Sequence, residues 1–160
     1  MARFLPGKAV AWALEAHALL GLFGGVLLLI VLWPQIPAEV PGHYDAAGNV
    51  TRFDPKSSLW LLVGVNAGLY TSLSVINFFP QMWNFPGTPD DRPRQVRLAR
   101  TFMRGLKAFV VWLFTVLLWL SVRVAQGVAV GLPWWFLPLG LFGPLVIIVW
   151  WLVLANRSAA

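Results

Sequence analysis

Three side chains able to bind a metal ion or a polar partner lie close together in the stretch 43–54. They are His43, Asp45 and Asp54. Imidazole and carboxylate groups are common metal ligands, but the spacing of these three matches no recognised metal motif. Asp45 is instead followed by Gly48 in the arrangement typical of a type I turn, in which the aspartate carboxylate accepts backbone N–H groups. We therefore expect a structural cap here, and no metal site.

A second polar set lies inside an otherwise apolar stretch. Its members are spaced four, four and three residues apart, which places them on one face of a helix; they are Asn66, Tyr70, Ser74 and Asn77. A polar face at membrane depth must contact protein or water. The face either forms hydrogen bonds between helices or lines a polar pathway or ligand cleft. Packing is the favoured interpretation, because the phenol of Tyr70 is the only ionisable group in the set.

Two ionisable residues, Glu15 and His17, occur early in the first apolar stretch. Such groups can transfer protons, and a histidine can ligate haem or chlorophyll. Counting back about 20 residues from Trp33 places both near the edge of the hydrocarbon core, where a glutamate pairs with a basic neighbour. His17 and His43 lie toward opposite membrane faces, so they cannot share one metal ion. We therefore expect an ion pair at Glu15 and no cofactor.

Basic side chains recur every three or four residues just before the third apolar stretch; they are Arg97, Arg100, Arg104 and Lys107. Apolar residues occupy the opposite face, so the segment is able to lie along the membrane interface. Each basic residue near an anionic lipid surface contributes about 1 kcal/mol of attraction. We therefore predict binding of anionic lipid headgroups, with a purely topology-determining charge as the alternative.

The elements that position these groups must be membrane helices. The 160-residue chain is 59% hydrophobic and only 11% charged, whereas soluble domains average roughly 45–50% and about 25%. This excludes a soluble enzyme and a disordered tail. Four apolar stretches can each cross a hydrocarbon core of about 30 Å; they cover residues 9–33, 59–82, 108–130 and 133–156. We predict an all-α, single integral membrane domain over residues 1–160: a four-transmembrane-helix bundle with an ordered extracytoplasmic loop at 34–58 and a basic cytoplasmic segment at 84–107.

The distribution of Lys and Arg predicts the orientation. Nine of the twelve fall on the side of the two chain ends and the segment 84–107, against Arg52, Lys56 and Arg123 on the other side. Under the positive-inside rule both termini are therefore cytoplasmic. Eight of the ten tryptophans lie near predicted span ends, as interfacial indoles do. The net charge of +6 is thus explained by topology and lipid, and we expect no nucleic-acid partner.

After the pair Val40-Pro41, the loop between the first two spans has a pattern formed by His43, Tyr44, Asp45, Gly48, Phe53 and Lys56. At these positions the loop resembles a bacterial membrane family of unknown function that forms the N-terminal module of SdpI-type toxin-immunity proteins. Thr51 departs from the pattern, where the family usually has Asp. The resemblance covers roughly residues 32–107 and implies a location in the bacterial inner membrane. SdpI-type proteins have further downstream spans, so an immunity function does not carry over.

No constellation for catalysis is evident, since the chain has no cysteine, no hydrolytic triad and no phosphate-binding glycine loop. We predict a non-enzymatic membrane protein that recognises a protein or peptide at the outer face through the six loop residues that match the family. The alternative is an accessory subunit of a larger respiratory or photosynthetic membrane complex. A small-solute transporter is less well supported, because only the fourth stretch is interrupted by prolines and no second stretch matches it.

Overall fold

The computed structural model describes residues 7–83 and 92–156. In this part of the chain it has four α-helices, two strands and three short 3-10 helices. They are α1 (Lys8–Leu32), η1 (Trp33–Gln35), β1 (Glu39–Tyr44), β2 (Val50–Pro55), η2 (Lys56–Ser58), α2 (Leu59–Phe78), η3 (Pro80–Met82), α3 (Arg92–Ala125) and α4 (Phe136–Asn156). Each α-helix is long and apolar enough to cross a membrane, which agrees with the predicted number of spans and indicates a multi-pass membrane protein.

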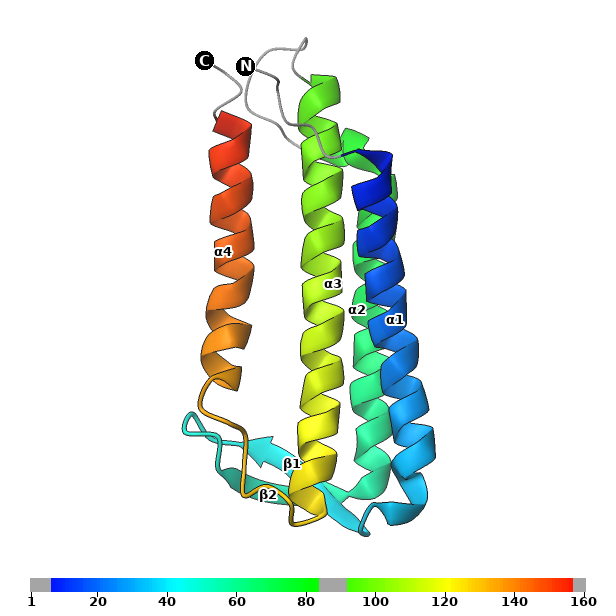
Figure 1. Ribbon diagram of the computed structural model, residues 1–160, viewed down its shortest axis with the longest axis vertical. Coiled ribbons are helices and arrows are strands. Elements are labelled where there is room, and N and C mark those ends of the chain that lie inside the picture. Colours follow the sequence, from blue (N-terminus) through cyan, green and yellow to red (C-terminus); the bar gives the residue numbers. More distant parts are fainter. Residues whose placement is uncertain (1–6, 84–91, 157–160) are drawn as a thin grey trace.

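Helix α3 is the central element of the bundle. Helices α1 and α2 pack against each other and against α3, while α4 runs along the opposite side of α3 (Figure 1). The arrangement is therefore a three-helix core with α4 attached to it. Because α3 touches all the other helices, its side chains decide which polar groups meet inside the bundle.

Helix α3 differs at both ends from its predicted span. Its 34 residues correspond to about 50 Å at 1.5 Å per residue, well beyond the roughly 30 Å of a hydrocarbon core. The basic segment that we expected to lie along the interface is instead the first half of this helix, with Pro93 in its first turn, where proline is tolerated. The helix ends early, at Ala125, because Gly127 adopts a φ of +73° and closes a Schellman turn, in which Val128 N donates to Arg123 O at 3.0 Å.

Small residues let α1 approach α3 closely. Ala18, Gly21 and Gly25 are buried along one face of α1, and Thr115 of α3 places its Oγ1 3.0 Å from the carbonyl oxygen of Gly21. A Cβ atom added at Gly25 would lie 3.2 Å from Thr115 Oγ1, whereas one added at Gly24 would meet nothing within 4 Å. Membrane helices use such small-residue faces to bring their backbones together.

We expect Gly25→Leu to lower the free energy of unfolding by about 1–3 kcal/mol, the usual effect of overpacking a filled interface. Gly24→Leu is the matched control, since it makes the same chemical change one residue away, where there is open space. Thermal unfolding in detergent, followed by tryptophan fluorescence, measures both variants. Equal melting temperatures for the two would contradict the close contact between α1 and α3.

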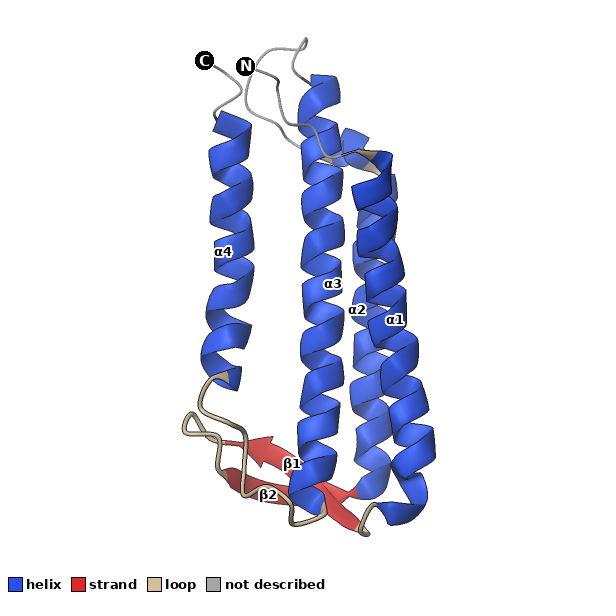
Figure 2. Cartoon of the chain, viewed as in Figure 1, coloured by secondary structure: helices blue, strands red, loops and turns tan. Residues whose placement is uncertain are grey.

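The segment between α1 and α2 folds as a small antiparallel hairpin across the end of the bundle (Figure 2). Glu39 lies opposite Pro55 and Tyr44 opposite Val50, with irregular pairing near His43. The expected turn is present: Gly48 N donates to Asp45 O at 3.0 Å, and Gly48 takes the positive φ of 86° that favours glycine.

A hydrophobic cluster fixes the hairpin to the helices. Val40 of β1 and Ile36 before it are buried in a core with residues of α1, α2 and α3, namely Leu29, Leu59, Leu118 and Val122. The connection between α3 and α4 adds a further contact, because Leu132 N donates to Gly48 O at 2.8 Å. The hairpin is thus held by both packing and backbone hydrogen bonds.

Candidate functional site

Polar groups gather at two places, one near each end of the bundle. We call the end where α1 begins and α4 ends the terminal end, and the end covered by β1 and β2 the hairpin end; they lie at opposite ends of the long axis (Figure 1). The terminal end contains a buried ion pair and a cavity. The hairpin end presents an exposed surface with a second cavity beneath it.

The ion pair joins Glu15 of α1 to Lys107 of α3. Lys107 Nζ lies 2.7 and 2.8 Å from the two carboxylate oxygens of Glu15, and it also donates to Ser74 Oγ at 2.8 Å. The Tyr70 hydroxyl donates to Glu15 Oε1 at 2.6 Å, and the Tyr70 ring lies 4.3 Å from Lys107 Nζ. Residues from three helices therefore satisfy both charges inside the bundle.

This cluster meets one sequence expectation and corrects another. Glu15 has the basic partner that its position at the core edge predicted. Lys107, however, was predicted to contact lipid headgroups, and its residue surface is only 2% exposed. Helix α3 continues through this region without a break, so Lys107 faces α1 and α2. Its charge is neutralised by Glu15 and is not available to a lipid headgroup. Arg97 is exposed on α3, whereas Arg100 and Arg104 are half-buried.

The four residues of the predicted polar face of α2 lie in three different environments. Asn66 is buried, and its Nδ2 donates to Val111 O at 3.2 Å, so it forms the interhelical contact that the packing interpretation requires. Tyr70 and Ser74 belong to the ion-pair cluster. Asn77 lines the neighbouring cavity.

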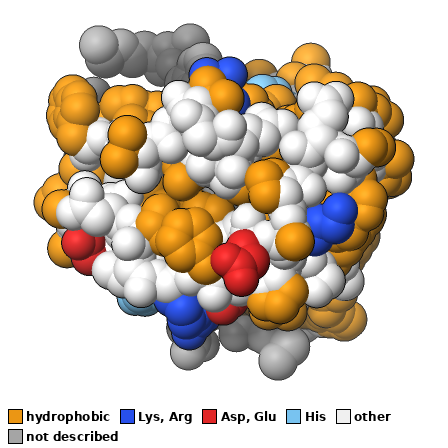
Figure 3. All heavy atoms as spheres, turned by 90° about the horizontal axis from the view of Figure 1, so that it is seen from below, with side chains coloured by type: hydrophobic (Ala, Val, Ile, Leu, Met, Phe, Trp, Pro, Cys, Tyr) orange, Lys and Arg blue, Asp and Glu red, His pale blue; other side chains and the backbone are white. Residues whose placement is uncertain are grey.

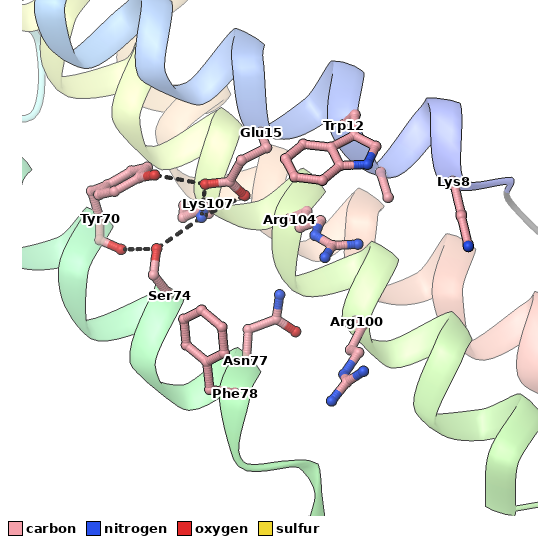
Figure 4. A pocket seen from close by; sticks show the side chains of 11 residues that line it. Lys8, Trp12, Glu15, Tyr70, Ser74, Asn77, Phe78, Arg100, Arg104 and Lys107 are labelled. Atoms are coloured by element: carbon pink, nitrogen blue, oxygen red, sulfur yellow. Dashed lines mark hydrogen bonds and ion pairs between the residues drawn. The ribbon is translucent and has the colours of Figure 1, made fainter.

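The cavity at the terminal end has a volume of about 490 Å³. It opens between α1, α2 and α3 next to the ion pair (Figure 4). Its polar and aromatic lining consists of Lys8, Trp12, Glu15, Tyr70, Ser74, Asn77, Phe78, Arg100, Arg104 and Lys107. Four of these side chains are basic and one is acidic, so the cavity is strongly positive.

His17 lies apart from this cluster, in an apolar groove bordered by α1, α3 and α4. Its ring stacks on Trp112 with 5.2 Å between ring centroids, and Trp112 Nε1 donates to His17 O at 3.0 Å. Glu15 and His17 therefore face different neighbours, as their separation of two residues predicts.

At the hairpin end, four of the six loop residues singled out by the sequence take part in contacts within the chain. Tyr44 OH donates to Ser121 Oγ of α3 at 3.2 Å, and burial raises the pKa of the Tyr44 phenol. Asp45 Oδ1 accepts the backbone N–H groups of Ala47 and Asn49 at 2.9 and 2.8 Å. A hydrogen bond from the Asn49 side chain has the largest effect on this carboxylate. Together with the backbone bonds it holds the pKa of Asp45 below its usual value. Gly48 forms the turn, and Lys56 Nζ lies 4.7 Å from the Trp33 ring centroid.

The other two of the six loop residues are His43 of β1 and Phe53 of β2. Both are exposed, and 57% of Phe53 is accessible. Arg52, which lies opposite His43, pairs with Asp54 at 3.0 Å. Among the described residues, no group of three His, Asp or Glu side chains lies close enough together to hold a metal ion. Seen from this end, hydrophobic side chains lie among single acidic, basic and histidine side chains (Figure 3).

Two features of these sites were not predicted from the sequence. Lys8 was counted only for topology, although it lines the terminal cavity with Arg100 and Arg104. Arg52 was counted only for topology, although it is exposed on the hairpin beside its partner Asp54. The signal for Lys107 was present, because an intramembrane glutamate requires a cation at similar depth, and Lys107 is the last basic residue before the third apolar stretch.

Comparison with known proteins gives one match. Residues 20–67 match a family described as a domain of unknown function (DUF1648). The matched part includes the second half of α1, the hairpin and the first half of α2, and it ends well before residue 107. No curated protein and no solved structure matches the chain. The match centres on the hairpin and its two supporting helices.

Proposed function

We propose that this chain is a non-enzymatic protein of the bacterial inner membrane that uses its β-hairpin to recognise a protein or peptide at the outer face. One observation carries the proposal: the hairpin is fixed to the helices through Val40, while His43, Arg52 and Phe53 of its two strands stay exposed. The resemblance to the SdpI-associated family rests on the same loop. An immunity activity is not part of the proposal.

The contacts that fix the hairpin favour binding because they order it in advance. Tyr44 is joined to α3 by a hydrogen bond to Ser121, and Gly48 is joined to the connection between α3 and α4. The loss of conformational entropy that comes with ordering this loop therefore does not reduce the affinity for a partner. An arginine and an aromatic ring on a rigid surface are also typical of the residues that contribute most to protein interfaces.

A second cavity, of about 410 Å³, lies beneath the hairpin. Its lining includes Tyr44 and Asp54 of the strands, together with Leu61 of α2 and Leu137 of α4. A partner that contacts the polar hairpin can thus insert an apolar side chain toward the helices. This combination suits an amphipathic peptide segment or an apolar protein loop.

The test is site-specific photo-crosslinking in intact membranes, with a photoreactive amino acid placed at position 53. We expect one specific crosslinked protein or peptide, reached from the outer face, whose capture falls at least about tenfold in His43→Ala, as for loss of a contact worth about 1.4 kcal/mol or more. The matched control is Val130→Ala, also at the hairpin end and 94% exposed, which should leave the capture unchanged. Unfolding temperature checks that each variant is folded.

Accessory membership of a larger membrane complex is the second candidate, and the position of α4 favours it. Only 6% of the apolar stretch of α4 is buried against the rest of this chain. Most of the surface of α4 is therefore available to lipid or to another subunit. Under this alternative the photoreactive group would react from α4 positions and not from position 53. Gentle detergent extraction followed by sizing separates the two: co-migration with fixed partners favours the subunit, and a lone monomer or homodimer favours the recognition protein.

A further inference from the structure

We propose that the cavity at the terminal end is a binding site for the phosphate headgroup of an anionic phospholipid. This inference is independent of the hairpin and of the function proposed for it. It rests on the charges that line the cavity, on two buried polar atoms that have no hydrogen-bond partner among the described residues, and on the position of the cavity at the ends of the helices.

The charge of the cavity is not balanced within the described residues. Lys107 is neutralised by Glu15 at 2.7 Å, which leaves Lys8, Arg100 and Arg104 around the same space. Among residues 7–83 and 92–156 the only ion pairs are this one and Arg52–Asp54 at the other end. The carboxylate of Glu15 offsets only one of the four cations in the lining, so the remaining positive charges repel one another and an anion placed among them reduces that repulsion.

Two buried polar atoms beside the cavity have no hydrogen-bond partner within the described part of the chain. They are Nε of Arg100 and Oδ1 of Asn77. Native proteins rarely leave such groups unpaired, so each requires an explanation. In Figure 4 the side chains of Arg100, Arg104 and Asn77 face the same space. The arginine N–H groups can donate hydrogen bonds to phosphate oxygens. The Asn77 carbonyl can accept a hydrogen bond from a hydroxyl group next to the phosphate, as in a glycerol headgroup.

The location of the cavity suits a ligand that is anchored in lipid. Lys8 is the first residue of α1 and Phe78 the last of α2, so the cavity lies at the helix ends. Trp12 and Phe78 border it and are 74% and 75% exposed, which offers apolar surface for the acyl chains beside the headgroup. A volume of about 490 Å³ is within the usual range of roughly 300–1,000 Å³ for small-ligand sites.

The test is native mass spectrometry of the full chain released from nanodiscs that contain equal amounts of phosphatidylglycerol and phosphatidylcholine. We expect one retained phosphatidylglycerol per chain, and retention at least about tenfold weaker in Arg100→Gln/Arg104→Gln, because two cations that face the phosphate are lost. The control Arg97→Gln/Arg123→Gln loses the same charge outside the cavity and should retain lipid within about twofold of the parent. Asn77→Leu changes no charge and should also weaken retention several-fold.

Each remaining outcome overturns the proposal. Equal loss in the control pair would mean that binding reflects overall charge, and equal retention of phosphatidylcholine would mean that the site does not select an anionic headgroup over a zwitterionic one. If soluble glycerol 3-phosphate, added to nanodiscs of phosphatidylcholine only, raises the unfolding temperature in an Arg100-dependent way, the site belongs to a soluble phosphate ester. If the Arg100→Gln/Arg104→Gln variant does not fold, the Asn77→Leu variant becomes the deciding test. Full retention of phosphatidylglycerol by Asn77→Leu would then refute the site.

Discussion

Lys107→Met is expected to lower the free energy of unfolding by about 3 kcal/mol, the lower end of the range for breaking one partner of a buried ion pair. The substitution keeps a chain of similar length but leaves the Glu15 carboxylate without its cation in the interior of the bundle. Tyr70 would still donate to Glu15, and the side chain of Glu15 is 23% exposed, so the loss should not reach the upper end. Unfolding in detergent, followed by tryptophan fluorescence, measures the change.

Two further variants make this prediction specific to the pair. Arg97→Met is the matched control, since Arg97 is a basic residue of the same helix but is exposed, and it should change stability little. The double variant Glu15→Gln/Lys107→Met removes both charges and should recover most of the loss, because no uncompensated charge remains. A double variant no more stable than Lys107→Met alone would show that the attraction between these two charges is not what the bundle depends on.

The number of spans could be predicted from sequence, but the ends of α3 could not. Hydropathy reports which residues can lie in lipid, and residues 92–107 are too polar to register as a span. They are nevertheless good helix formers, and only Gly105 interrupts them after Pro93. The helix therefore continues where the apolar signal stops. At the other end, Gly127 closes the helix although the apolar pattern continues to residue 130.

The hairpin shows a similar division between local and long-range information. The turn at Asp45 and Gly48 could be predicted, because it depends on neighbouring residues and on the conformational freedom of glycine. Strand β1 could not, since it contains Pro41 and Gly42, two residues that are poor strand formers. It forms because Val40 is buried against helices that are far away in the sequence.

The candidate sites follow the same rule. Spacing placed Tyr70, Ser74 and Asn77 on one helix face, but it could not show that Glu15 and Lys107, 92 positions apart, meet there. A stripe on one helix does not show which of its members face inward. Lys107 was therefore assigned to the lipid surface together with Arg100 and Arg104, whereas the structure separates a buried ion pair from a basic cavity.

The orientation in the membrane gives an all-or-none prediction. We expect a reporter that is active only in the cytoplasm to be active when fused after Ala160 or inserted near Pro89, two positions outside the described residues, and to be inactive at Val130. Val130 is the better outer position because it is 94% exposed, whereas Asn49 and Gly131 pair with each other. A periplasm-specific reporter at the same positions is the control and should give the opposite pattern.

The physical reason for the predicted orientation remains once the structure is considered. Lys107 contributes to the ion pair and not to the membrane surface, yet the terminal end still carries six basic residues in the described helices, namely Lys8, Arg92, Arg94, Arg97, Arg100 and Arg104. The hairpin end carries Arg52, Lys56 and Arg123. Moving the larger set across the membrane is the less favourable insertion. Cytoplasmic activity at Val130 would invert this orientation, place the hairpin inside the cell, and remove the basis for recognition at the outer face.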